Sequence, residues 1–136
     1  MVAEWAGKYI GIPFKTRGRD FSGVDCWGVI YLVLKNEFGL TNLKSFHERY
    51  ETVEDEDKLQ RIIEAEKGSW IPVPEGSERP GDAVVLRIWK AHCHIGVVIG
   101  DGYMLHALKD INVCREKYNG ILWRRRIIGF FRYPGM

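Results

Sequence analysis

Apolar residues along the chain are arranged differently in its two halves. Over residues 2–10 they recur at helical spacing, and from Cys26 to Leu34 they form a nearly continuous run that is typical of a buried helix. After residue 74 they occur in short runs separated by glycine and polar turns, which is typical of strands. Helices followed by an antiparallel sheet predict an α+β fold with the central helix packed on one face of the sheet.

The remaining elements follow from the same patterns. Residues 52–67 begin with acidic side chains and continue with spaced apolar ones, which predicts an amphipathic helix with carboxylates at its positive end. The length of 136 residues predicts a single domain, spanning 1–136, with this acidic helix as an insertion. Strands are predicted over 83–87, 94–99, 103–107 and 127–133.

The central helix is predicted to begin at Cys26 and to end before Gly39. Asp25 or Ser22 can cap its start, and Gly39 can adopt the left-handed conformation after its last turn. Cys26 then lies in the first turn, where unpaired N–H groups and the helix dipole favour a thiolate. Because buried free cysteines are also common core residues, Cys26 is a nucleophile only if the fold brings a base to it.

Two histidines lie on the arms of a predicted β-hairpin, His94 before the turn at 100–102 and His106 after it. A two-residue turn would put their side chains on opposite faces of the sheet. A three-residue loop or a bulge would place His106 opposite Gly96, diagonal to His94 on the same face and within reach of it. Gly102 can supply the left-handed residue that such a loop requires.

In the second register, one cysteine and two histidines form the set of a Cys-His-polar triad. One imidazole takes the thiol proton, and the other polar side chain fixes the tautomer of the first. We expect the three side chains to converge where the start of the helix meets the sheet. An imidazole on the opposite side of the sheet from the sulfur would argue against this arrangement.

Charge and hydropathy limit the kinds of binding partner and location that the sequence predicts. The net charge of +2 is too small to indicate nucleic-acid binding, and we interpret the basic residues near the end of the chain as a solvated face. No apolar run approaches about 20 residues, and the first residues resemble no secretion signal, so we expect neither a membrane span nor a signal peptide. The basic residues are Arg115, Lys117, Arg124, Arg125, Arg126 and Arg132.

The run His92-Cys93-His94 is a candidate metal site. In a strand only the two histidines of this run share a face, and no fourth ligand lies nearby in the sequence. We therefore expect no metal and no other cofactor, and we interpret Cys93 and Cys114 as packing residues with reduced thiols.

Three motifs together resemble the NlpC-type cysteine peptidases of bacterial cell walls, over nearly the whole chain except the acidic helix. The resemblance is strongest to the branch of this family that tailed phages and prophages carry. The three family motifs are Asp25-Cys26-Trp27-Gly28 at the start of an apolar helix, Pro80-Gly81-Asp82 before a strand, and His94-Ile95-Gly96-Val97 followed by His106-Ala107. The resemblance to the phage branch rests on the first of these motifs together with Trp123 and Gly129-Phe130-Phe131-Arg132-Tyr133 near the end.

The resemblance implies a papain-like domain in which Cys26 is the nucleophile, His94 the base and His106 the orienting residue. It also implies hydrolysis of peptidoglycan stem peptides, typically at the amide bond between the side chain of D-glutamate and a diamino acid. Asp25, Trp27 and Phe14 are the predicted substrate-binding residues. Trp27 stands where many members have serine, and Phe14 stands where many have a tyrosine hydroxyl.

Two functions follow as hypotheses. The first is a cell-wall endopeptidase carried in a phage tail, located in the virion or in the host cytoplasm before assembly, with other tail proteins as partners. The second is a structural tail-assembly or tail-tip component built on a peptidase scaffold with little or no catalysis, since a fold does not fix a function.

Overall fold

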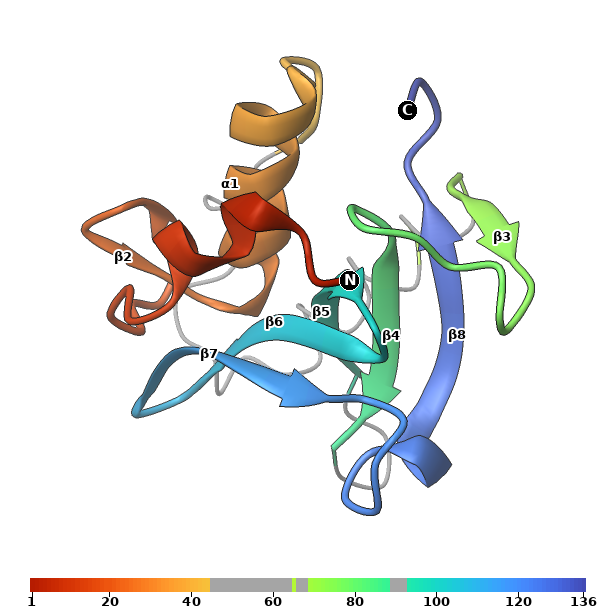
Figure 1. The fold of residues 1–136 in the computed structure, drawn as a ribbon. Helices are drawn as coiled ribbons and strands as arrows, with labels where there is room; N and C mark the ends of the chain where they lie inside the picture. Colours follow the sequence, from red (N-terminus) through yellow and green to blue (C-terminus); the bar gives the residue numbers. More distant parts are fainter. Residues whose placement is uncertain (45–64, 66–68, 89–92) are drawn as a thin grey trace.

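The structure is a computed structural model that describes residues 1–44, 65, 69–88 and 93–136. Figure 1 shows a helical N-terminal part lying beside a curved sheet formed by the second half of the chain. The acidic helix predicted over 52–67 lies outside the described residues, apart from Ala65.

The sheet has six strands in the order β3-β8-β4-β5-β6-β7, and each neighbouring pair is antiparallel. This arrangement confirms the predicted α+β fold. All four predicted strands are present, within two residues of the expected bounds. The strands are β3 (Ile71–Val73), β4 (Ala83–Arg87), β5 (Cys93–Gly100), β6 (Tyr103–Leu108), β7 (Ile111–Lys117) and β8 (Ile127–Arg132).

Helix α1 (Cys26–Phe38) begins and ends as its sequence predicts. The Asp25 side chain accepts a hydrogen bond from the N–H of Gly28 at 2.9 Å, which caps the first turn. Gly39 follows the last turn in the left-handed conformation, with φ of 67°. The first predicted helix is the 3₁₀ helix η1 (Glu4–Tyr9), and a second 3₁₀ helix, η2, spans Arg124–Arg126.

A short hairpin of β1 (Arg19–Asp20) and β2 (Gly23–Val24) leads into α1 and explains its Cys-x-Gly motif. A Cβ atom at Gly28 would lie 2.2 Å from the carbonyl oxygen of Gly18, which is closer than real contacts allow. Gly28 therefore lets the hairpin cross the first turn of the helix, and this crossing fixes the position of Cys26.

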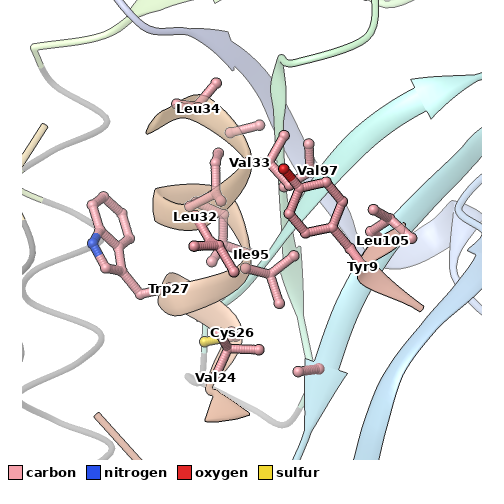
Figure 2. Close-up of a cluster of buried hydrophobic side chains, with 14 of the residues drawn as sticks. Tyr9, Val24, Cys26, Trp27, Leu32, Val33, Leu34, Ile95, Val97 and Leu105 are labelled. Atoms are coloured by element: carbon pink, nitrogen blue, oxygen red, sulfur yellow. The ribbon is translucent and has the colours of Figure 1, made fainter. Parts of the chain in front are cut away.

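Side chains alternate between the two faces of the sheet, and each face has its own apolar cluster. The helix face packs against α1; Figure 2 shows Ile95, Val97 and Leu105 facing the helix, with Cys26 at its start. The other face, here called the Trp123 face, is built on Trp123 and contains Val84, Leu86, Val98, Met104 and Phe130.

The turn between β5 and β6 settles the register of the hairpin. Val97 pairs with Leu105 and Val98 with Met104, and the register shifts at Gly100. This is the three-residue-loop or bulge register, because each of these pairs sums to 202. The prediction that His94 and His106 share one face is therefore confirmed.

In the described part of the chain, no helix combines the length and apolar character that crossing a bilayer requires.

Candidate active site

The thiol of Cys26 lies at the first position of α1 and is 6% exposed as a residue. Burial, followed by the charge of Asp25, raises the pKa of the thiol to about 12, while Arg19 and the N–H groups of Ile95 and Trp27 act in the opposite direction. The expectation that the helix start favours a thiolate is therefore wrong for this state, because desolvation outweighs the helix N–H groups. Cys26 is an uncharged thiol here.

The sulfur of Cys26 lies beside the main chain of β5. The N–H of Val98 donates to the main-chain carbonyl of Asp82, just before β4, at 2.8 Å. Because N–H groups alternate in direction along a strand, those of the odd-numbered residues of β5 point toward β6. The pairs that join β5 to β6 begin at Val97, and the N–H of Ile95 bonds to the sulfur instead. Cys26 therefore reaches the sheet at the end of the β5–β6 ladder, next to the main chain of His94.

The two imidazoles contact each other directly. Nε2 of His94 lies 2.9 Å from Nδ1 of His106, and both side chains are almost completely buried. The ring of Trp123 stacks on His94 with centroids 6.0 Å apart and meets His106 edge to face at 5.4 Å. Packing against this indole holds both rings in one orientation.

These imidazoles belong to the Trp123 face and not to the helix face. His94 pairs with Leu86, and His106 follows Met104 by two residues on β6, and both of these partners belong to the Trp123 face. The expectation that all three side chains converge on the helix side of the sheet needs correction. The sulfur of Cys26 reaches the sheet from the helix face, at the end of the hydrogen-bonded β5–β6 pairing. Neither imidazole is among the described contacts that shift the pKa of the Cys26 thiol.

Burial also keeps both imidazoles uncharged. It lowers the pKa of His94 well below the ordinary value, and the neighbouring His106 adds to this effect. It lowers the pKa of His106 as well, although Glu116 opposes the shift. The thiol of Cys26 and both imidazoles are therefore uncharged in this structure, a state that suits proton transfer at neutral pH.

Glu116 is a site residue that the sequence did not predict. Its Oε1 lies 2.8 Å from Nε2 of His106, and its Oε2 accepts a hydrogen bond from Nε1 of Trp123 at 2.7 Å. It lies on β7, which was missing from the predicted strands. The pairing of β7 with β6 places Glu116 on the face of His106, since Met104 pairs with Glu116 and His106 with Cys114. No apolar pattern in the sequence marks this strand.

The predicted substrate-binding residue Asp25 has a structural role. Its carboxylate is fully buried and accepts bonds from the N–H groups of Arg17 and Gly28 and from the guanidinium of Arg19 at 2.8 to 2.9 Å. A substrate ammonium would have to displace Arg19 to reach it. The structure therefore supports capping and ion pairing, and does not support the predicted ammonium contact.

Trp27 and Phe14 are also accounted for by packing. Trp27 is 1% exposed, donates from Nε1 to the carbonyl of Lys44 at 3.0 Å and packs against Trp70. Phe14 is partly buried against the same cluster and forms a β-bridge with Val24. The buried position of Trp27 argues against the predicted contact with substrate, and the role of Phe14 stays a prediction.

One group of side chains in the described residues is close enough to hold a metal ion. Donor atoms of His106, Cys114 and Glu116 lie within 4.8 Å of one another. The hydrogen bond between His106 and Glu116 explains why two of them are close. The predicted metal candidate at 92–94 lies partly outside the described residues.

Five of the six basic residues near the end of the chain are exposed, as the interpretation of a solvated face expects, and Arg132 is the partly buried exception. Arg132 makes two bonds of 2.8 Å to the buried carboxylate of Asp82, which joins β8 to the start of β4. Arg115 and Lys117 lie over the ring of Tyr103. At least these three have partners within the fold.

Comparison with known proteins identifies the fold and the family. The sequence profile of the NlpC/P60 family matches residues 11–132. A solved NlpC/P60 family protein from Bacillus cereus ATCC 10987 superposes with a TM-score of 0.62 at 20% identity, covering 93% of this chain and 37% of that one. This likeness confirms the predicted papain-like fold.

Two curated relatives extend the comparison. "Murein DD-endopeptidase MepS/Murein LD-carboxypeptidase" of Escherichia coli (strain K12) is 24% identical over 91% of this chain and 55% of its own length. "Probable endopeptidase p60" of Listeria seeligeri is 26% identical over 97% of this chain and 21% of its own. The chain thus spans about half of the first relative and a fifth of the second. With its profile match over most of its length, this chain belongs to the NlpC/P60 family.

Proposed function

We propose that the chain is a cysteine peptidase that hydrolyses amide bonds in the stem peptides of peptidoglycan. The observation that carries the proposal is the position of Cys26, whose sulfur bonds to the N–H of Ile95 beside the buried His94–His106 pair. The name of the Escherichia coli relative, a murein DD-endopeptidase, supports the choice of substrate.

The first half of the reaction forms a thioester. Nδ1 of His94 takes the thiol proton as the sulfur of Cys26 attacks the amide carbon, and the developing oxyanion is held by N–H groups at the start of α1. The N–H of Cys26 suits this role because the first N–H groups of a helix have no acceptor within it. The C–N bond then breaks, and the leaving amine takes the proton from Nδ1 of His94.

The second half regenerates the enzyme. A water molecule gives a proton to Nδ1 of His94 and attacks the thioester carbon, and the C–S bond breaks to release a carboxylic acid. The departing sulfur takes back the proton from His94. In both halves of the reaction His106 stays bonded to Nε2 of His94, so Nδ1 of His94 remains available for the reacting groups.

The finer proposal concerns the bond and the setting. We propose that the bond cut is the amide between the side chain of D-glutamate and a diamino acid, and that the enzyme is carried in a phage or prophage tail, in contact with other tail proteins. The support is the resemblance over Asp25-Cys26-Trp27-Gly28 and 129–133. In the structure the first motif builds the start of α1, and Arg132 from the second anchors β8 to Asp82.

A structural tail component with little catalysis is the second candidate. The uncharged, deeply buried thiol of Cys26 favours it, because a nucleophile needs a thiolate. The two candidates differ in what Cys26 does. In a peptidase its alkylation at neutral pH depends on His94, whereas in a scaffold it is slow and unchanged by His94→Gln.

The decisive experiment compares the protein with its Cys26→Ala variant on purified sacculi and on a synthetic stem tetrapeptide. We expect new amino groups and shorter peptides from the unaltered protein and none from Cys26→Ala. Asp20→Ala is the control, because Asp20 lies exposed on the hairpin that leads into α1, and this variant is expected to keep activity. Equal product from the unaltered protein and Cys26→Ala would overturn the proposal.

A further inference from the structure

We infer that Glu116 is a positioning residue that acts through His106 to make Nδ1 of His94 the proton acceptor. The inference rests on the proposed function, since it gives that reaction its base. Its structural basis is a chain of three hydrogen bonds that runs from His94 through His106 and Glu116 to Trp123 on the Trp123 face.

The donor and acceptor roles along this series of hydrogen bonds are set by Trp123, at the end opposite His94. An indole N–H only donates, so Oε2 of Glu116 accepts from Trp123 at 2.7 Å. A carboxylate at neutral pH has no proton to give, so Oε1 of Glu116 accepts from His106 as well, at 2.8 Å. Nε2 of His106 therefore carries a hydrogen.

The hydrogen on Nε2 of His106 in turn determines which nitrogen of His94 carries a hydrogen. A neutral imidazole has a hydrogen on only one nitrogen, so Nδ1 of His106 is an acceptor once Nε2 is the donor. The 2.9 Å contact between the two rings requires one donor, which must be Nε2 of His94. Nδ1 of His94 is left with a lone pair, and this is the nitrogen that the proposed reaction needs.

Both rings must be neutral for the hydrogen bonds to run in this direction, and their burial favours the neutral state. A positively charged His106 would donate from Nδ1 and leave the hydrogen of His94 on Nδ1, where it blocks the base. Burial opposes that state in both rings. The Glu116 carboxylate lies 2.8 Å from His106 and, through this ring, stabilises the positive charge that His94 acquires during the reaction.

The position of Glu116 fits this role. Glu116 pairs with Met104 on β6, which places its side chain diagonal to His106 on the same face. Its side chain is about one-third exposed, whereas that of His106 is 1% exposed. The carboxylate thus keeps contact with solvent while its oxygens reach two buried donors, which lowers the desolvation cost of holding a charge there.

The test uses Glu116→Gln, which keeps the shape of the side chain but offers only one acceptor oxygen. We expect the amide oxygen to stay with Trp123 and the amide NH₂ to donate to Nε2 of His106. The hydrogens of both rings then move to Nδ1. The nitrogen-15 NMR shifts of the two rings in the free protein distinguish these tautomers, and kcat is expected to fall about 10- to 100-fold with KM within about twofold.

Two variants complete the test. Glu116→Asp keeps the carboxylate and is expected to recover the Nε2-protonated tautomers and part of kcat. Glu78→Gln is the matched control, because the carboxylate of Glu78 accepts from the hydroxyl of Tyr118 at 2.7 Å and from the N–H of Gly76, and not from either imidazole of the pair. It is expected to leave the tautomers and kcat unchanged.

Unchanged tautomers in Glu116→Gln would overturn the inference, as would changed tautomers with unchanged kcat. The NMR measurement needs no substrate, so it separates this inference from the proposed function. If the unaltered protein cuts no peptidoglycan but shows both rings protonated at Nε2, the proposed function fails and the orienting role of Glu116 stands.

Discussion

Two buried polar clusters lie near the start of α1, and they differ in what holds them together. The Asp25 cluster is charged and closed: the carboxylate bonds to Arg19 and to two N–H groups. The His94–His106 pair is uncharged and leaves one ring nitrogen for chemistry. A buried charge that is fully paired holds the fold, whereas a buried titratable pair kept neutral by its surroundings is suited to moving protons.

The largest expected effect is a loss of activity when the His94–His106 pair is changed. His94→Gln removes the proposed base, so we expect kcat/KM for a stem peptide to fall by about 10²- to 10⁴-fold. The free energy of unfolding is expected to change little, because the clusters around the ring remain packed. Kinetics and urea unfolding on the same preparation give both quantities. A variant that loses stability in proportion to activity would give His94 a structural role.

A change in the Asp25 cluster is instead expected to lower the free energy of unfolding. Asp25→Ala leaves the guanidinium of Arg19, 10% exposed, without its carboxylate and removes the cap of α1. Removing one partner of a buried ion pair costs about 3 to 5 kcal/mol. Urea unfolding measures the loss, with Asp20→Ala as the control, since Asp20 lies on the same hairpin but is solvent-exposed. A loss below about 1 kcal/mol would show that the network contributes little.

Gly28→Ala tests the crossing that fixes Cys26. The new Cβ atom meets the carbonyl oxygen of Gly18, so the hairpin must move away from the helix. We expect a loss of about 1 to 3 kcal/mol in unfolding free energy. Gly7→Ala is the control, because a Cβ atom there has nothing within 4 Å. Equal stability of the two variants would contradict the close approach.

A smaller effect is expected in the pH dependence of stability. Because burial lowers the pKa of His94 and His106, the unfolded chain binds protons below about pH 6.5 that the folded chain does not. The free energy of unfolding should therefore fall as pH decreases from 6.5 toward 5. His94→Gln should reduce this slope by up to one proton, measured by urea unfolding at each pH. A slope that the variant leaves unchanged would contradict neutral burial of His94.

The sequence predicted what depends on local signals. Asp25 marks the start of α1 and Gly39 its end, and Gly102 lies in the bulged turn whose register decides the face of His106. These residues act through backbone geometry, which a sequence displays directly.

What the sequence missed depends on contacts across strands. β7 has one buried apolar residue, Val113, among alternating exposed ones, so no apolar pattern marks it and Glu116 stays hidden. The neutral state of Cys26 was also missed, because the helix start favours a thiolate locally and only the packed fold supplies the opposing burial.

The central claim is that Cys26 and His94 exchange a proton at the open end of the β5–β6 ladder. A crystal structure with a stem-peptide aldehyde, bound as a hemithioacetal on the sulfur of Cys26, tests it most directly. The account predicts Nδ1 of His94 within hydrogen-bond reach of the sulfur or the adduct oxygen, with Nε2 still bonded to His106. An adduct on Cys26 with both imidazoles turned away from it, or no adduct on Cys26, would contradict the account.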